Sequence, residues 1–166
     1  RELDTYQGQL LNYIIDDKGV VLIATFGLRH STFPNMVMGR ALPATLSIRK
    51  KLCDELGVDC HIGATYGKAY CGCVGGVMRH DYSILGPSVN LAARLMCSSE
   101  NRGILVDGSV EHEARSKFIF KSLHPVIAKG YAKPVPTFEM VEAVERYDIF
   151  TSSIHNKKTL ISTKFE

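Results

Sequence analysis

The chain has 166 residues, enough for one domain with a hydrophobic core and too few for two ordinary domains. Its 20 basic and 17 acidic residues leave a net charge of only +3, which excludes the dense basic surface of a general nucleic-acid-binding protein. No apolar run is long enough to cross a bilayer and no signal peptide opens the chain, so the sequence predicts a cytoplasmic protein without a membrane segment.

The first half of the chain predicts one hairpin and one long helix. Two apolar runs separated by a turn predict a β-hairpin over residues 13–26. After a loop over residues 28–37, apolar residues at helical spacing predict an amphipathic helix over 38–56 that ends at Gly57. Pro43 indicates that this helix either starts or is kinked near its position.

The second half alternates strands and helices. A second hairpin is predicted over residues 58–74, turning at Gly67-Lys68, and a helix is predicted to begin at Pro87. Glycine is dense in this hairpin region, which indicates close approach of another backbone or of a ligand, at Gly63, Gly67, Gly72, Gly75 and Gly76. Later elements are predicted as strands at 104–106, 118–120 and 136–141, a helix at 110–114, and a polar tail at 146–166. This order predicts an α+β fold.

The cysteines indicate a reducing compartment. There are five, an odd number, and their spacing gives no disulfide framework: Cys53, Cys60, Cys71, Cys73 and Cys97. Cys71 and Cys73 would share one face of a strand. That pattern favours two small core side chains, and the alternative is half of a metal or redox site.

Residues 82–94 form the most informative segment of the chain. They predict a strand, a glycine turn and a helix start in which Asn90 and Arg94 lie four residues apart, on one helix face. The guanidinium of Arg94 suits phosphate oxygens, and the amide of Asn90 suits a sugar. Their neighbours in sequence are small and apolar, a setting in which unused polar groups are costly. The combination indicates nucleotide chemistry.

The pattern G-x-x-V-N-x-A-A-R, following R-H-D-Y-S-I-L, resembles the signature of class III nucleotidyl cyclases, above all the second catalytic half of soluble adenylyl cyclases. Further segments match in the same order: Gly8-Gln9, Asp16 to Gly19 before Phe26-Gly27, His61 to Ala64 with Gly67, Val74-Gly75, and Ala128 to Gly130 before Phe138. The resemblance implies a ferredoxin-like βαββαβ cyclase domain over residues 1–145, N-terminally truncated so that its first strand and first helix are missing, with 146–166 as a linker.

The resemblance also implies an activity. Such domains convert ATP or GTP into a 3′,5′-cyclic nucleotide and pyrophosphate, by in-line attack of the ribose 3′-hydroxyl on the α-phosphate, with two Mg²⁺ or Mn²⁺ ions held by two carboxylates. The site is shared with a second cyclase domain, either a homodimer copy or a neighbour in the same parent chain. We therefore expect cyclic AMP formation, and less strongly cyclic GMP. The alternative is a regulatory pseudo-cyclase half that binds nucleotide or an effector and supports its partner.

The resemblance gives three residues roles on the phosphate and sugar side. Arg94 matches the arginine that stabilises charge on the α-phosphate in the transition state, and its alternative is a surface pair with Glu100. Asn90 matches the asparagine that orients the ribose, and its alternative is an amide bonded to the backbone. Lys129 matches the lysine on the terminal phosphates, and its alternative is a solvated turn residue.

Three further residues concern the base and the metals. Ser83 matches a purine-reading position, although a lone strand serine is unremarkable. Asn12 stands where adenylyl cyclases carry a purine-reading lysine and guanylyl cyclases a glutamate, so the base choice stays open. Asp16 matches the position of the second metal carboxylate, but Asp16 and Asp17 also suit a plain turn. The other metal-binding aspartate would lie on the missing first strand.

Overall fold

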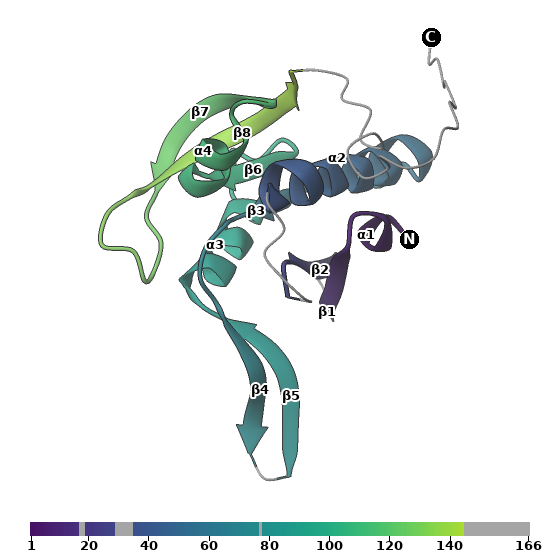
Figure 1. The fold of residues 1–166 in the computed structure, drawn as a ribbon, viewed down its shortest axis with the longest axis vertical. Helices are drawn as coiled ribbons and strands as arrows, with labels where there is room; N and C mark the ends of the chain where they lie inside the picture. The colour runs from purple at the N-terminus through teal and green to yellow at the C-terminus, as the bar shows by residue number, and fades with distance from the viewer. Residues whose placement is uncertain (17–18, 29–34, 77, 145–166) are drawn as a thin grey trace.

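The computed structural model describes residues 1–16, 19–28, 35–76 and 78–144, and the predicted tail at 146–166 therefore lies outside the described part. Two two-stranded sheets and one four-stranded sheet combine with a few helices (Figure 1), in agreement with the predicted α+β class. Within these ranges, none of the helices combines the length and apolar character that crossing a bilayer requires.

The chain begins with α1 (Glu2–Thr5) and the hairpin of β1 (Gly8–Asp16) and β2 (Gly19–Phe26), which confirms the first predicted hairpin. The antiparallel register shifts between Leu10 and Asn12, so a bulge lies just before Asn12. The turn residues 17–18 lie outside the described part, and Asp17 is one of them.

One long helical segment follows, as the periodicity predicts. Its central part is α2 (Leu42–Lys50), flanked by the π-helical turns η1 (Val37–Ala41) and η2 (Lys51–Glu55). Pro43 occupies the second position of α2, so the predicted change of helix near this residue is confirmed. Gly57 follows with φ +64°, a left-handed conformation that suits glycine and ends the helix.

The main core surrounds a four-stranded sheet in the order β3 (Ile62–Ala64), β6 (Ile104–Asp107), β8 (Val135–Ala143) and β7 (Phe118–Val126). Strands β3 and β6 are parallel, whereas β8 is antiparallel to both β6 and β7. Every residue of β6 is buried. Because strand side chains alternate, Ile104 and Val106 pack in the cluster that includes Leu42 and Val110, and Leu105 packs with Leu91 on the other face.

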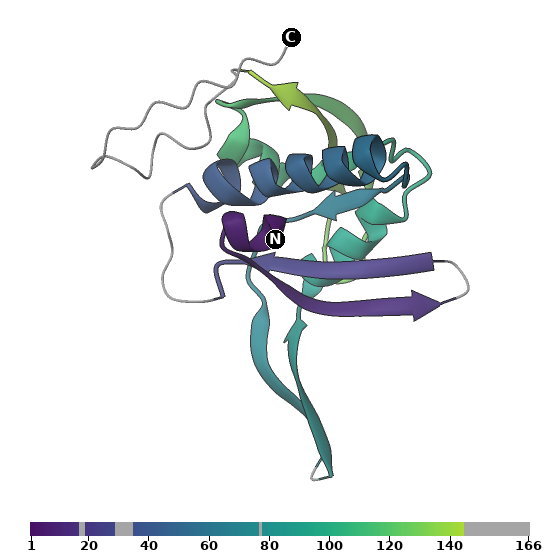
Figure 2. The ribbon, with the colours of Figure 1, turned by 90° about the vertical axis from the view of Figure 1, so that its right-hand side faces the viewer.

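The second predicted hairpin is wrong in its pairing. Strand β3 pairs with β6, whereas β4 (Tyr70–Gly76) pairs with β5 (Arg79–Leu85) in a separate antiparallel hairpin. A period-two pattern identifies a strand but not its partner, and here the fully buried β6 provides the partner for β3. Hairpin β4–β5 projects away from the rest of the molecule (Figures 1 and 2), and we call it the arm.

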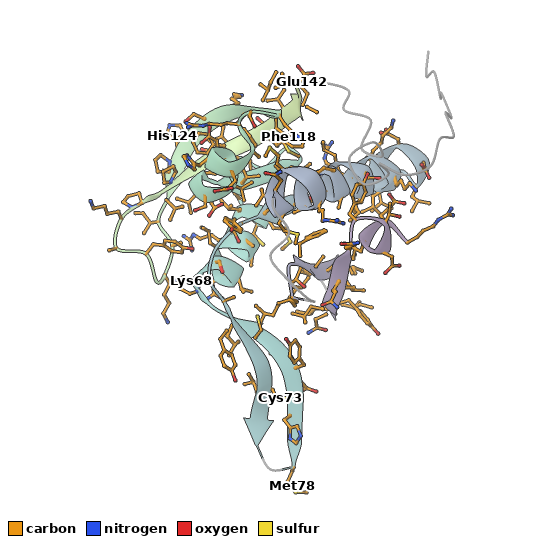
Figure 3. The ribbon with its side chains drawn as sticks, in the orientation of Figure 1. Lys68, Cys73, Met78, Phe118, His124 and Glu142 are labelled. Atoms are coloured by element: carbon orange, nitrogen blue, oxygen red, sulfur yellow. The ribbon has the colours of Figure 1, made fainter. Side chains whose placement is uncertain are left out.

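The arm exposes its side chains. Met78 at its tip is 97% exposed, and the apolar side chains of Tyr70, Tyr82 and Leu85 are also exposed. Cys71 and Cys73 are exposed too, so the expectation that they are core side chains is wrong. Figure 3 places Cys73 and Met78 on this hairpin, where no layer of the described residues covers it.

Glu2 connects helix α1 to the long helical segment through an ion pair and a hydrogen bond. Glu2 accepts hydrogen bonds from Lys51 Nζ and Ser47 Oγ, both at 2.6 Å, and the Lys51 contact does most to lower the pKa of Glu2. A lowered pKa in the folded state means that this stabilisation is complete above the ordinary carboxyl pKa and is lost as pH falls through the lowered value. We expect Glu2→Gln to reduce the melting temperature by about 2 °C at neutral pH and by less near about pH 3.

Thermal denaturation followed by circular dichroism at several pH values measures this difference. The comparison of the two proteins at each pH cancels the titration of the other carboxyl groups. If Glu2→Gln lowered the melting temperature equally at neutral and acid pH, the stabilisation would not come from the ionised carboxylate of Glu2.

Candidate functional site around helix α3

Helix α3 (Pro87–Met96) leaves β5 through Gly86, and the glycine allows a tight backbone approach. A Cβ added at Gly86 would lie 3.3 Å from the Cα of Ala69 and from the carbonyl oxygen of Lys68. Pro87 is the first helical residue, where the missing N–H leaves no internal hydrogen bond unmade. The predicted strand, turn and helix start are therefore confirmed.

The two faces of α3 are sharply different. Leu91 and Leu95 are fully buried on one face, whereas Asn90 and Arg94 are exposed on the other. The small apolar neighbours in the sequence therefore do not enclose the two polar side chains, because the helix turns its leucines toward the sheet. The side chains of Asn90 and Arg94 are therefore accessible to a molecule that binds on the exposed face of α3.

Neither side chain forms a hydrogen bond or an ion pair within the described part of the chain. The Arg94 guanidinium and the Asn90 amide have no hydrogen-bond or ion-pair partner among the described residues, and only the Asn90 backbone N–H donates, to Gly86 O at 3.4 Å. Glu100 instead contacts the ring nitrogen of His124 at 3.2 Å. The alternative readings, a structural Arg94–Glu100 pair and a backbone-bonded Asn90 amide, are therefore absent from this part of the structure.

Lys129 lies beside the start of α3. The next residue, Gly130, has φ +94°, and a Cβ added there would lie 3.1 Å from the Cβ of Pro87. On the other side of Lys129, Ala128 is buried in the same cluster as Leu91. The loop between β7 and β8 thus contacts the start of α3, and the exposed Lys129 lies in this loop.

Hydrogen bonds fix both ends of α3. At the start, Thr65 Oγ1 donates to Ser88 O at 2.9 Å, and Ser88 Oγ donates to Lys68 O at 3.3 Å. At the end, the buried Asn101 amide donates to Leu95 O at 3.0 Å and to Ile62 O at 3.2 Å. Sequence reasoning missed Asn101, although an asparagine between a helix and a Gly-led strand is a signal for such a bridge.

Strand β3 and α3 are in direct backbone contact. A Cβ added at Gly63 would lie 2.0 Å from the carbonyl oxygen of Ala92 and 2.6 Å from the amide nitrogen of Met96. At Gly67 it would lie 3.4 Å from Ser88 Cβ. The predicted close approach of another backbone is confirmed at Gly63, whereas Gly67 makes only an ordinary contact with a side chain and nothing lies within 4 Å of Gly76.

Two ionisable groups in this region, Asp107 and Tyr131, have raised pKa values. Burial raises the pKa of Asp107, although the N–H of Val110 donates to this carboxyl at 3.1 Å and opposes the rise. Burial and the nearby charge of Asp107 raise the pKa of Tyr131, which keeps this phenol protonated at neutral pH. Arg94 on α3 and Lys129 in the neighbouring loop are both exposed cations.

The remaining predicted site residues are more scattered. Ser83 is half-buried on β5, opposite Gly72 and three residues before Gly86. Asn12 and Asp16 lie on the separate β1–β2 hairpin, where Asn12 is exposed and its Oδ1 accepts a hydrogen bond from the N–H of Tyr13 at 2.8 Å. Asp16 is the last residue of β1, and its side chain lies outside the described part.

The described residues do not gather a metal site. No three His, Cys, Asp or Glu side chains come close enough together in this part of the chain to hold an ion. The side chain of Asp16 lies outside the described part, so the two-carboxylate set that a pair of divalent ions requires stays a prediction. Of the predicted site residues, Asn90 and Arg94 share the exposed face of α3, and Lys129 lies in the loop that contacts its start.

The fold is an α+β domain in which α3 exposes Asn90 and Arg94, and the neighbouring β7–β8 loop exposes Lys129. The chain belongs to the family of adenylate and guanylate cyclase catalytic domains, whose family model matches residues 20–154. This match begins after β1, so it does not include Asn12 or Asp16.

Two groups of known proteins are similar to this chain. Adenylate cyclase type 10 of Rattus norvegicus is 29% identical over 148 residues, covering 87% of this chain, and that of Homo sapiens is 30% identical over 141 residues, covering 82%. The chain spans only 9% and 8% of the lengths of these relatives.

The solved structures establish the fold. The adenylyl cyclase CyaB from P. aeruginosa matches with a TM-score of 0.68 at 21% identity, over 89% of this chain and 77% of that chain. The guanylate cyclase domain of RhGC from Catenaria anguillulae, solved with GTP, matches with a TM-score of 0.67 at 17% identity, over 86% and 76%. The predicted class III cyclase fold is thereby confirmed.

Proposed function

We propose that this chain supplies one half of a nucleotidyl cyclase site that forms 3′,5′-cyclic AMP and pyrophosphate from ATP. The observation that carries the proposal is the group of Asn90, Arg94 and Lys129 around α3, exposed and without partners among the described residues. Family membership supplies the reaction class.

Each of the three residues takes one part of the nucleotide. Arg94 donates its fork of N–H groups to the α-phosphate and stabilises the charge that builds there as the ribose 3′-oxygen bonds to phosphorus and the bond to the leaving pyrophosphate breaks. Asn90, one turn earlier, holds the ribose so that the attacking oxygen is in line. Lys129, at the start of the helix, neutralises the terminal phosphates.

Divalent metal ions are part of the chemistry that the family implies, and they would activate the hydroxyl and neutralise the triphosphate. The described residues bring no three possible metal ligands together, and the side chain of Asp16 lies outside them. We therefore assign no catalytic step of this chain to a metal, and Asp16 stays a candidate for one carboxylate only. The remaining metal ligands belong to another part of the shared site.

A second cyclase domain completes the site, either in the same parent chain or as another copy. The arm supports this proposal because its exposed apolar side chains form a surface that a single soluble domain has little reason to keep: Tyr70, Val74, Met78, Tyr82 and Leu85. A structurally similar protein, the guanylyl cyclase domain of the RhoGC fusion protein from Blastocladiella emersonii, is described as a non-canonical dimer.

ATP is the proposed substrate because the curated relatives are adenylate cyclases. Ser83 and Asn12 are the proposed base readers, and an hydroxyl and an amide can each bond to adenine. Asn12 also favours one alternative, a regulatory half, because an amide stands where the family carries a lysine or a glutamate, and its Oδ1 already accepts one hydrogen bond from the N–H of Tyr13.

Product formation from ATP and from GTP tests the proposal. The full polypeptide that carries this chain is assayed with Mg²⁺ and with Mn²⁺, and this chain is assayed alone and mixed with a second cyclase domain. We expect cyclic AMP to exceed cyclic GMP by about tenfold or more. Cyclic GMP in excess would overturn the substrate, and no product from either nucleotide would favour the regulatory half.

A further inference from the structure

Two cysteine side chains meet at the end of the long helical segment. Cys53 lies in η2 and Cys60 in the connection that leads to β3, and their Sγ atoms are 3.9 Å apart. Both are half-buried. The chain turns back between them at Gly57, and the Val58 N–H donates to Leu52 O at 2.8 Å, which holds the reversal.

The other cysteines are arranged differently. Cys71 and Cys73 are exposed on the arm, and Cys97 is exposed where α3 ends. Among the described cysteines, only Cys53 and Cys60 have their sulfur atoms in contact. A disulfide bond is about 2.05 Å long, so the two sulfur atoms need to approach by about 2 Å. The connection from Leu56 to Val58 is exposed and can accommodate this movement.

The surroundings of Cys60 bear on which of the two sulfur atoms attacks an oxidant first. Burial and the neighbouring Cys53 raise the pKa of Cys60 to about 11, and the positive charge of Arg49 only partly opposes them. Burial therefore disfavours the thiolate form of Cys60, and we assign the first attack on an oxidant to Cys53.

We propose that Cys53 and Cys60 are a redox modification site that closes to a reversible intramolecular disulfide in the presence of a peroxide. The Cys53 thiolate attacks one peroxide oxygen, which breaks the O–O bond and releases the other oxygen as water after protonation. The resulting sulfenic acid is attacked by the Cys60 sulfur, the S–S bond forms and a second water leaves. Two thiols and one hydrogen peroxide thus give one disulfide and two waters.

The disulfide would act on the residues that support α3, the helix that carries Asn90 and Arg94. Cys60 lies two residues before Ile62, whose backbone N–H donates to Gly103 O at 2.8 Å and whose carbonyl accepts from the Asn101 amide. Nearby, Arg49 Nη2 donates to Arg102 O at 3.2 Å. Oxidation would therefore lock the end of the long helical segment to the strand on which α3 rests.

Mass spectrometry of the peroxide-treated full chain tests the site directly. After alkylation of free thiols and proteolysis, we expect one peptide pair linked through Cys53 and Cys60, present in the monomer and lost on treatment with dithiothreitol. Cys53→Ser and Cys60→Ser should each abolish the linked pair, whereas Cys97→Ser, the matched control, should leave it unchanged. The readout does not depend on cyclase activity.

Two outcomes would overturn the proposal. One is that Cys53 and Cys60 stay fully alkylated while the exposed Cys71 or Cys73 is oxidised. The other is that the peptide pair linked through Cys53 and Cys60 is found in a disulfide dimer and not in the monomer.

Discussion

Arg94→Ala is expected to lower the turnover number for cyclic nucleotide formation by about 100- to 1000-fold and to change nucleotide affinity little. The reason is that a bidentate guanidinium bonds most strongly to the α-phosphate when charge accumulates there, in the transition state. In the ground state the α-phosphate oxygens carry less charge, and the proposed contact between Lys129 and the terminal phosphates would be kept. Steady-state kinetics and equilibrium nucleotide binding on the full polypeptide separate the two effects.

Arg115→Ala is the matched control for this experiment. Arg115 is also an exposed arginine at a helix end, after α4 (Gly108–Ala114), so it reports on loss of positive charge alone. Both variants should keep the melting temperature of the unchanged protein, because neither guanidinium is buried. Equal turnover of the two variants would remove Arg94 from the reaction and favour the regulatory half.

Local sequence signals predicted the elements that position the site. Helical spacing and Gly57 predicted the long helical segment, and Gly86-Pro87 predicted the start of α3, because caps and turns are chosen by nearby residues. The pairing of β3 with β6 was not predictable in this way. It depends on burial of β6 by residues far away in the chain, and the alternation within β3 does not contain that information.

The same distinction holds for the site. The resemblance gave Asn90, Arg94 and Lys129 their expected roles, but the contact that joins Lys129 to α3 runs through Gly130 and Pro87, which are distant in the sequence. Asn101 was missed because its importance comes from burial and from three carbonyl groups at different places in the fold. Exposure of the arm was missed because a strand sequence does not reveal whether another layer covers it.

Gly63→Ala is expected to reduce the free energy of unfolding by about 2 to 5 kcal/mol, enough to leave much of the protein unfolded or insoluble. The added methyl group would lie 2.0 Å from the carbonyl oxygen of Ala92, and backbone atoms cannot turn aside as a flexible side chain can. Strand β3 is held on its other side by its parallel pairing with β6, so α3 has to move outward. Urea denaturation of the soluble fraction measures the loss.

Gly76→Ala is the matched control, since nothing lies within 4 Å of a Cβ at that position on the arm, and its effect should stay within about 0.5 kcal/mol. Equal stability of the two variants would mean that β3 and α3 do not touch as described. Because α3 carries Asn90 and Arg94, the outward shift should also lower turnover in whatever Gly63→Ala protein stays folded. Gly76→Ala should keep both properties, which ties the loss of activity to the position of the helix.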